Sequence, residues 1–316
     1  MQHDNSANKT SFLAVLLATC NGEKYLPQLL DSVLEQLPAD SFVLAHDDGS
    51  SDSTPGILDS YSARFPALRV LKDGIKTGGA CRNFAHLLEN VSADYFMLCD
   101  QDDVWLTGKI AAALTEMRRL EAEHGTATPL LVHTDLAVAD KNLKPLAASF
   151  MAYQNLLPST AEILPRLAAQ NVVTGCTTLI NRPLRDLAAP IPPQAQMHDW
   201  WLAMVACAFG HIGYDPTPLI LYRQHGGNDT GAHKWSLAFV SRRMLSSRKN
   251  SIERACRQAG EFVRRYEKLL APQTRGWLET YAELGSLGFI QKRIFLFKNG
   301  IRKNGPLRTI GFFLSV

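Results

Sequence analysis

Features that mark several other protein classes are scarce in this sequence. The chain of 316 residues has six cysteines, at positions 20, 81, 99, 176, 207 and 256, and no two of them form a Cys-x-x-Cys pair. This spacing predicts neither disulfides nor a cysteine-ligated metal site, and reduced thiols are typical of a cytosolic protein. No apolar stretch approaches the ~20 residues that a membrane-spanning helix needs. We therefore expect a cytoplasmic chain without a transmembrane segment.

The first residues also lack the pattern of a secretion signal. The start "MQHDNSANKTS" is polar, and the apolar run "FLAVLLATC" that follows lasts nine residues. Neither a basic start of the usual kind nor a small-residue cleavage site accompanies this run, so a buried strand is the better interpretation. With 46% apolar and 20% charged residues, the composition is that of an ordinary globular protein.

Charge is distributed unevenly along the chain. Residues 1–233 hold 16 Lys and Arg against 25 Asp and Glu, a net charge of −9, whereas residues 234–316 hold 17 against 5, a net charge of +12. Opposite net charges indicate different partners for the two parts. We therefore predict one domain over residues 10–233, divided into halves at about 128, and a separate basic, helical region over 234–316.

Short apolar runs alternate with helical patterns in the first domain. The runs are "FLAVLLA" (12–18), "FVLAHD" (42–47), "LRVLKD" and "DYFMLC". Apolar residues recur at helical spacing between these runs, and a further helix is expected over 104–125. This order predicts right-handed βαβ crossovers and therefore an α/β fold with a mostly parallel, Rossmann-like sheet flanked by helices.

Polar loops follow three of the predicted strands. They are "TCNGEKY", "DDGSSDS" and "DQDD". Ligands of such sheets bind beyond the carboxyl ends of the strands, and these ends lie at one edge of the sheet. The three loops together therefore predict a binding site.

The loop "DQDD" places Asp100, Asp102 and Asp103 within four residues. Like charges at this spacing repel and raise one another's pKa unless a cation lies among them. Mg²⁺ is commonly held by one or two carboxylates and by substrate phosphates, so Mg²⁺ or Mn²⁺ is the expected cation. The alternative is an acidic loop that caps a helix at Val104. The loop "DDGSSDS" also allows two interpretations, a turn with a helix cap or a carboxylate that accepts from a base or a ribose.

Four stretches, taken in order, resemble the successive motifs of the family 2 inverting glycosyltransferases, which have the GT-A fold. They are "VLLATCNGEKYLPQLLDSVLEQ", "AHDDGSSDST", "GGACRNFAHLL" and "DYFMLCDQDDVWLTGKI". "MHDWWLAMVACAFG" and "PLILYRQHGGN" are similar to the rhamnosyltransferase-like branch, and the resemblance covers about residues 12–230. It implies Mg²⁺ or Mn²⁺, a nucleotide-diphosphate sugar donor such as dTDP-rhamnose, and a glycan or lipid-linked glycan acceptor. The first half would bind the nucleotide and the second half the acceptor.

The resemblance also implies a role for each matching residue. Nucleotide contacts are implied for Thr19, Asn21, Asp47, Asp48, Arg82 and Asp100. Metal binding is implied for Asp102, Asp103 and His225, and Asp199 would be the general base that deprotonates the acceptor hydroxyl. Gly175 and Arg223 would lie near the donor sugar or its phosphates. Many relatives have an aromatic residue against the base where this chain has Cys20, so stacking on the base is lost.

Ordinary structural explanations stay open for several of these residues. Asp199 precedes "WWLAMVACAFG" and suits a helix N-cap. The segment "YRQHGGN", which ends at Asn228, suits a polar loop with a glycine turn. Trp200 and Trp201 suit either core packing or a platform for a sugar.

The basic region mixes cationic and apolar residues in a helical pattern. The apolar members are Phe289, Ile290, Ile294, Phe295, Phe297 and Ile301, and the cationic members are Lys292, Arg293, Lys298, Arg302 and Lys303. Such a mixture predicts an interfacial helix attracted to anionic lipids, and favours this over nucleic-acid binding. A solvated helical face is the alternative. An interfacial helix would place the protein at the inner face of the cell membrane as a peripheral protein.

The sequence therefore predicts an inverting glycosyltransferase with two rivals. A sugar-phosphate nucleotidyltransferase would need a glycine-rich loop and a following arginine after the first strand, and "ATCNGEKY" has neither. A non-catalytic module that binds a nucleotide or a glycan would need no base such as Asp199.

Overall fold

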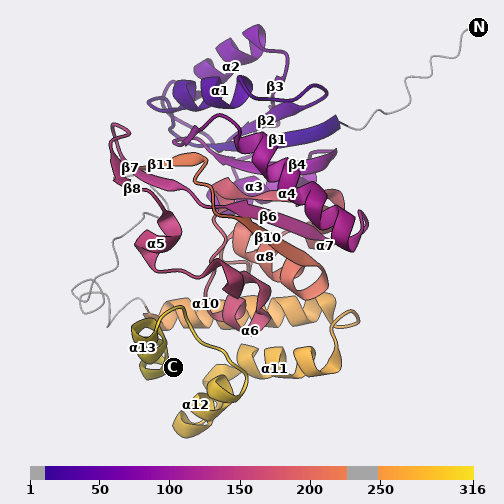
Figure 1. The fold of residues 1–316 in the computed structure, drawn as a ribbon, viewed down its shortest axis with the longest axis vertical. Coiled ribbons are helices and arrows are strands. Elements are labelled where there is room, and N and C mark those ends of the chain that lie inside the picture. Colours follow the sequence, from indigo (N-terminus) through magenta and orange to yellow (C-terminus); the bar gives the residue numbers. More distant parts are fainter. Residues whose placement is uncertain (1–10, 226–247) are drawn as a thin grey trace, which may run out of the picture.

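The computed structural model describes residues 11–225 and 248–316, which form an α/β domain followed by a helical region (Figure 1). A seven-stranded sheet has the order β3-β2-β1-β4-β9-β6-β10. Its strands are β1 (Ser11–Thr19), β2 (Phe42–Asp47), β3 (Leu68–Val70), β4 (Ala93–Asp100), β6 (Leu130–Thr134), β9 (Leu179–Asn181) and β10 (His211–Asp215). In this sheet β9 pairs antiparallel with β4 and β6, and the other neighbours are parallel. The predicted α/β fold is confirmed.

Strand β1 is buried on both faces, as its continuous apolar run predicts. Leu13, Val15 and Leu17 belong to the core that includes α1 (Leu26–Leu34), α2 (Thr54–Arg64) and α4 (Lys109–His124). Ala14 and Leu16 belong to the core on the opposite face, which includes α3 (Ala80–Glu89), α7 (Arg182–Ala188) and α8 (His198–Phe209). Successive residues of a strand point to opposite faces, so one apolar run serves both cores.

A second sheet joins the acidic loop to a distant strand. Its order is β5-β11-β7-β8, with β5 (Val104–Trp105), β7 (Ala137–Asp140), β8 (Pro145–Ala147) and β11 (Ile220–Gln224). Val104 and Trp105 pair antiparallel with Leu221 and Ile220. The prediction of a helix from Val104 is therefore wrong, because these two residues are extended against β11 and α4 begins only at Lys109. This pairing holds the acidic loop beside the end of β11.

The C-terminal helices pack at the lower end of the α/β domain in the view of Figure 1. The remaining elements are α5 (Phe150–Gln154), η1 (Pro158–Glu162), α6 (Leu164–Ala169), η2 (Gly175–Thr177), α10 (Arg248–Tyr266), α11 (Pro272–Ala282), η3 (Leu284–Ser286), α12 (Phe289–Lys298) and α13 (Pro306–Ser315). The ring of Phe262 on α10 lies 5.5 Å from that of Trp201 on α8, measured between centroids, and both side chains are fully buried. The two regions therefore share one core.

Two features predicted from the sequence fall on residues that the structure does not describe. The predicted domain boundary at residues 233 and 234 lies outside the described ranges, as does Asn228. Within residues 11–225 and 248–316, no helix has the length and apolar character needed to cross a membrane.

Candidate active site

A cavity of about 1290 Å³ opens at the carboxyl ends of β1, β2 and β4. Its wall contains residues of all three polar loops, among them Asn21, Asp48 and Asp100. The N-terminal turn of α8 and the residue after β11 complete it, with Asp199 and His225. The structure thus brings the three loops to one cavity, as the strand order predicts.

The first two loops are tied together by Asp47 at the end of β2. Thr19 Oγ1, at the end of β1, donates to Asp47 Oδ1 over 2.9 Å. The same carboxylate accepts from Ser50, over 2.8 Å from its N–H and 2.6 Å from its hydroxyl. Thr19 lines the cavity, whereas Asp47 is outside its lining. Asp47 therefore shapes the loop, and the prediction that it contacts a nucleotide stays a prediction.

Asp48 does line the cavity, and its carboxylate holds the loop before α3. The backbone N–H groups of Thr77, Gly78 and Gly79 all donate to it. Burial opposes ionisation of this carboxyl, but the hydrogen bonds from Gly79, Gly78 and Thr77 outweigh burial and lower the pKa of Asp48. Asp48 is therefore ionised at neutral pH. Its predicted contact with a base would have to use the remaining acceptor capacity of these two oxygens.

Gln101 clamps the loop after β1, a role that the sequence motifs did not predict. Its Oε1 accepts from the N–H of Cys20, and its Nε2 donates to the carbonyl of Cys20, each over 2.8 Å. Asn21 follows with a positive φ of 50°, and its Oδ1 accepts from the N–H of Ser51 over 2.9 Å. Cys20 and Asn21 both line the cavity. In the sequence, the only sign that Gln101 matters is its position between Asp100 and Asp102.

The acidic loop and the end of β11 meet at Asp102. The imidazole Nε2 of His225 lies 2.7 Å from Asp102 Oδ2, and both residues line the cavity. The His225 ring packs against Tyr25, with 5.0 Å between ring centroids. Two predicted metal ligands, 123 residues apart in sequence, therefore lie side by side.

Asp103 lies behind this pair and is fully buried, outside the cavity lining. Its Oδ1 accepts from the N–H of Arg223 over 3.2 Å. Burial and, after it, the charges of Asp102 and Asp100 raise the pKa of Asp103 well above its usual range. Potential ligand atoms of Asp100, Asp103 and Cys176 lie within 4.8 Å of one another. The crowding of carboxylates expected from the sequence is thus present in the structure.

The donor atoms of this region suit a hard divalent cation. Asp100, Asp102 and Asp103 offer carboxylate oxygens and His225 an imidazole nitrogen. Mg²⁺ takes oxygen ligands, and Mn²⁺ takes the same ligands and tolerates nitrogen, whereas the Cys176 sulfur suits neither. A cation would also offset the repulsion that raises the pKa of Asp103.

The two predicted arginines are not part of the cavity lining, although each lies beside a residue that is. The guanidinium of Arg223 donates to the carbonyls of Asp102 and Lys141 over 2.8 and 3.0 Å, and to Gln28 Oε1 over 2.8 Å. It therefore positions the backbone of the acidic loop. Arg82 is exposed on α3, with its guanidinium near Gly78. Contact of either side chain with phosphate stays a prediction.

Asp199 is a buried carboxylate at the cavity wall, in the first turn of α8. It is not the N-cap suggested as its ordinary role, because the helix begins at His198 and Met197 is the N-cap. Its Oδ1 accepts from the N–H of Trp200 over 2.6 Å, and its Oδ2 from the N–H of Gly175 over 2.9 Å. Burial outweighs these hydrogen bonds and raises the pKa of Asp199 to about 7. A carboxylate with this pKa can accept a proton near neutral pH.

His198 and Gly175 complete the surroundings of Asp199. Both line the cavity, and a Cβ at Gly175 would lie 2.8 Å from His198 Nε2. Burial lowers the pKa of His198 to about 3, so the ring is neutral. Of the two tryptophans, Trp201 is fully buried in the core, whereas Trp200 lines the cavity and donates to the carbonyl of Leu167.

The cavity wall also includes residues from the C-terminal region. Ser251 on α10 and Lys303 after α12 both line it. The sequence predicted a separate function for this region, and nothing in the motifs indicated that it reaches the site.

Comparison with known proteins agrees with this architecture. Residues 14–170 match the sequence profile of glycosyl transferase family 2. The chain belongs to that family. The family 2 glycosyltransferase is 28% identical over 229 residues to the dTDP-rhamnosyl transferase RfbG of Shigella flexneri, and the match covers 69% of this chain and 74% of RfbG.

Solved structures with a similar fold include a mannosyltransferase and TarS. The mannosyltransferase PcManGT of Pyrobaculum calidifontis, solved with GDP-Man and Mn²⁺, has a TM-score of 0.55 at 15% identity, covering 91% of this chain and 72% of the other. Residues 1–349 of S. aureus TarS, solved with UDP-GlcNAc, have a TM-score of 0.53 at 15% identity, covering 91% and 89%. At these identities the comparison supports the fold alone, which is the predicted GT-A fold.

Proposed function

We propose that this family 2 glycosyltransferase moves rhamnose from dTDP-rhamnose to a hydroxyl of a surface polysaccharide or lipid-linked glycan, with inversion at the anomeric carbon. The choice of donor rests on the likeness to RfbG. The mechanism rests on one observation: Asp199, a buried carboxylate with a pKa of about 7, lines the same cavity as Asp100 and Asp102.

Inversion requires a base on the face of the sugar opposite the leaving group, and Asp199 is the residue proposed for this role. The acceptor oxygen forms a bond to the anomeric carbon as the bond from this carbon to the diphosphate oxygen breaks. The proton of the acceptor hydroxyl passes to Asp199, which must be ionised beforehand. The N–H groups of Gly175 and Trp200 hold its carboxylate in place during this step.

The cation is proposed to lie at the acidic loop, held by Asp102 and His225, with Asp100 and Asp103 as the other candidate ligands. Mg²⁺ or Mn²⁺ bound there supplies positive charge that stabilises the leaving diphosphate. Arg223 keeps the backbone of Asp102 in position through its 2.8 Å hydrogen bond to the carbonyl.

The proposal is tested by donor turnover. dTDP-rhamnose, UDP-sugars and GDP-sugars would be offered with Mg²⁺ or Mn²⁺ to the wild type, Asp199→Asn, Asp102→Asn and the control Asp94→Asn. Asp94 forms an exposed ion pair with Arg182 and is outside the cavity lining. We expect metal-dependent turnover of dTDP-rhamnose in the wild type and the control, and its loss in the other two variants.

Each rival predicts a different result. Turnover of another nucleotide sugar would retain the transferase and reject rhamnose. Nucleotide binding in a thermal-shift assay without turnover of any donor would favour the non-catalytic module. Synthesis of a nucleotide sugar from a nucleoside triphosphate and a sugar phosphate would identify the nucleotidyltransferase.

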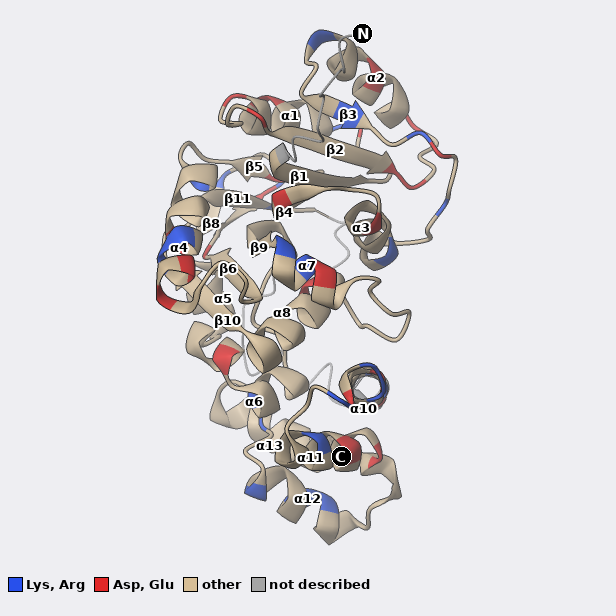
Figure 2. Ribbon diagram, turned by 90° about the vertical axis from the view of Figure 1, so that its right-hand side faces the viewer, with Lys and Arg blue, Asp and Glu red and all other residues tan. Residues whose placement is uncertain are grey.

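The last two helices are proposed to bind an anionic lipid surface, where a lipid-linked acceptor would be found. Phe289, Ile290 and Phe297 on α12, and Ile310 and Leu314 on α13, are each more than half exposed. Figure 2 shows Lys and Arg on α12 at this end of the molecule. Apolar side chains beside cations are what a membrane-surface helix presents. Ile301 is not part of this surface, because it is fully buried after the end of α12.

Sedimentation with vesicles tests this surface. The full chain should sediment with phosphatidylcholine vesicles that contain phosphatidylglycerol, more weakly at high salt, and little with phosphatidylcholine alone. Phe297→Glu should reduce binding. Leu269→Glu should not, because Leu269 is also exposed but lies outside α12 and α13. Equal binding by both variants, or no binding at low salt, would reject the lipid surface.

A further inference from the structure

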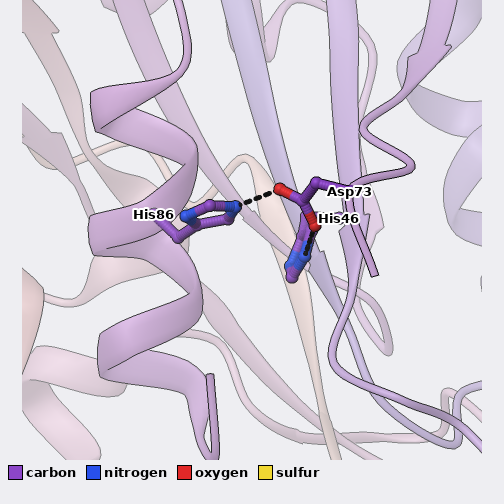
Figure 3. A group of neighbouring side chains, drawn as sticks. All are labelled: His46, Asp73 and His86. Atoms are coloured by element: carbon purple, nitrogen blue, oxygen red, sulfur yellow. Dashed lines mark hydrogen bonds and ion pairs between the residues drawn. The ribbon is translucent and has the colours of Figure 1, made fainter. Parts of the chain in front are cut away.

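Two histidines and an aspartate meet outside the cavity, on the α3 side of β2. His46 is on β2, Asp73 is in the loop after β3, and His86 is on α3. Figure 3 shows the Asp73 carboxylate between the two imidazoles, with one oxygen facing each ring. Potential ligand atoms of the three residues lie within 4.8 Å of one another, and none of the three lines the cavity.

Asn83 fixes which nitrogen of His46 can bind a ligand. The Nδ2 of Asn83 donates to the carbonyls of His46 and Thr19, over 3.2 and 3.5 Å, so its Oδ1 is an acceptor. This Oδ1 lies 2.7 Å from His46 Nδ1, which must therefore carry a proton. In the neutral ring, Nε2 is then left with its lone pair. A hydrogen bond of this kind on the second nitrogen is typical of histidines that bind metals.

The lone pair of His46 Nε2 faces Asp73 Oδ1 over 3.4 Å. Two acceptors in this arrangement repel each other unless a proton or a cation lies between them. Asp73 Oδ2 lies 2.6 Å from His86 Nε2, and Asp73 Oδ1 also accepts from the N–H of Ile75 over 3.0 Å. The carboxylate is thus fixed in position with one imidazole nitrogen on each side.

One of the two distances from Asp73 to an imidazole matches the separation of ligand atoms in a zinc site, and the other is shorter. A tetrahedral Zn²⁺ has bonds of about 2.0–2.2 Å, which places its ligand atoms roughly 3.4 Å apart. The separation of His46 Nε2 and Asp73 Oδ1 has this value, and that of Asp73 and His86 would widen when the metal replaces the proton between them. His46 is buried, whereas the side chains of Asp73 and His86 are 25% and 16% exposed, which leaves a path for an ion from solvent.

We propose that His46, Asp73 and His86 bind one divalent transition-metal ion, with Zn²⁺ as the expected occupant. Two imidazoles and one carboxylate are a donor set that zinc takes readily and that Mg²⁺ does not. The ion fastens the loop after β3 to β2 and α3. This loop continues to Thr77, Gly78 and Gly79, whose N–H groups hold Asp48 at the cavity. The role proposed for the ion is to hold this loop in place, and the site is distinct from the acidic loop.

Metal analysis of the full chain tests the proposal without any assay of activity. The wild type would be equilibrated with Zn²⁺ and a competing chelator, and compared with His86→Ala and Asp73→Asn. His211→Ala serves as a control, because His211 is exposed and distant in sequence, and Asp102→Asn reports on the acidic loop. Co²⁺ provides a second probe, through the visible absorption of a tetrahedral site.

We expect one Zn²⁺ per chain and a higher Tm with Zn²⁺ in the wild type, His211→Ala and Asp102→Asn. In His86→Ala and Asp73→Asn, affinity should fall by at least the ~10–100-fold seen when supporting residues of a metal site are removed, and the rise in Tm should disappear. If the wild type binds no Zn²⁺, the three residues share only a proton and the proposal is wrong. Zinc binding that is lost in Asp102→Asn or His211→Ala, but kept in His86→Ala, would also overturn it.

Discussion

The Nε2 atom of His225 lies 2.7 Å from Oδ2 of Asp102, and this contact joins the acidic loop to the residue that follows β11. The backbone of the two segments is already paired at Val104 and Leu221. The imidazole therefore meets the carboxylate from a fixed position. A carboxylate held in this way is oriented before any ligand arrives.

Removal of this imidazole should weaken the site without unfolding the protein. We expect His225→Ala to reduce kcat/KM by about 10–100-fold, as loss of a metal ligand or its orienting partner does, and to raise the Mn²⁺ concentration needed for half-maximal activity. Initial rates over a Mn²⁺ titration measure this. Gln224→Ala is the neighbouring control, because Gln224 is outside the cavity lining. An unchanged metal requirement in His225→Ala would assign His225 a packing role against Tyr25.

Asp199→Asn should abolish the base. General-base catalysis contributes about 10²–10⁴-fold, so kcat should fall by this factor while the donor still binds. In the wild type, kcat should rise with pH through about 7 and level off above it, because Asp199 accepts a proton only when it is ionised. The pH profile of single-turnover rates is the measurement. A profile that is flat from pH 5 to 8 would contradict the assignment.

The same carboxyl should also affect stability, in the opposite direction. Its pKa is about 7 in the folded protein against an ordinary value of 3.8, so the folded state binds the proton more tightly than the unfolded state. Its contribution to stability is therefore complete below about pH 4 and is lost as the pH rises through 7. Relative to Asp199→Asn, the free energy of unfolding of the wild type should fall by at most about 1.4 kcal/mol per pH unit in this range. Urea unfolding at pH 5 and pH 8 checks the sign.

Gly175→Ala should lower activity by displacing His198. The added Cβ would lie 2.8 Å from His198 Nε2 and 3.5 Å from Asp199 Oδ2, and the first distance is too short for an ordinary contact. The ring must move, and a shift near the base should reduce kcat more than it changes KM for the donor. Gly276→Ala is the matched control: its Cβ meets nothing within 4 Å in α11, and the variant should be more stable by up to ~1 kcal/mol. Full activity in Gly175→Ala would show that the site tolerates the shift.

Most strands and helices of the first domain could be predicted, because the sequence patterns that indicate them are local. The run that forms β1 is apolar throughout, and "FVLAHD" has the bounds observed for β2. The segment Val104–Trp105 could not be predicted, since its extended form depends on β11, which lies more than 100 residues away. The same pairing buries Asp103 while Asp102 stays at the cavity, and adjacent carboxylates cannot be distinguished from composition or spacing.

Side-chain hydrogen bonds were the least predictable part of the site. The sequence motifs indicated Asp48 as a nucleotide contact. They did not indicate that three backbone N–H groups of the loop before α3 would donate hydrogen bonds to its carboxylate. The position of the Gln101 side chain depends on its hydrogen bonds to the backbone of Cys20. The tautomer of His46 depends on its hydrogen bond to the side-chain amide of Asn83. Such partners depend on how the loops close, and that depends on the whole fold.

The position of Ser251 and Lys303 in the cavity wall limits what can be removed from this protein. A chain cut after residue 233 would lose part of the wall and would expose the core that Trp201 shares with Phe262. The exposed apolar side chains of α12 and α13 and the cavity are therefore held at a set separation by one packed body. On a bilayer, that separation would act as a ruler, and it would determine how far from the lipid surface a sugar can be added.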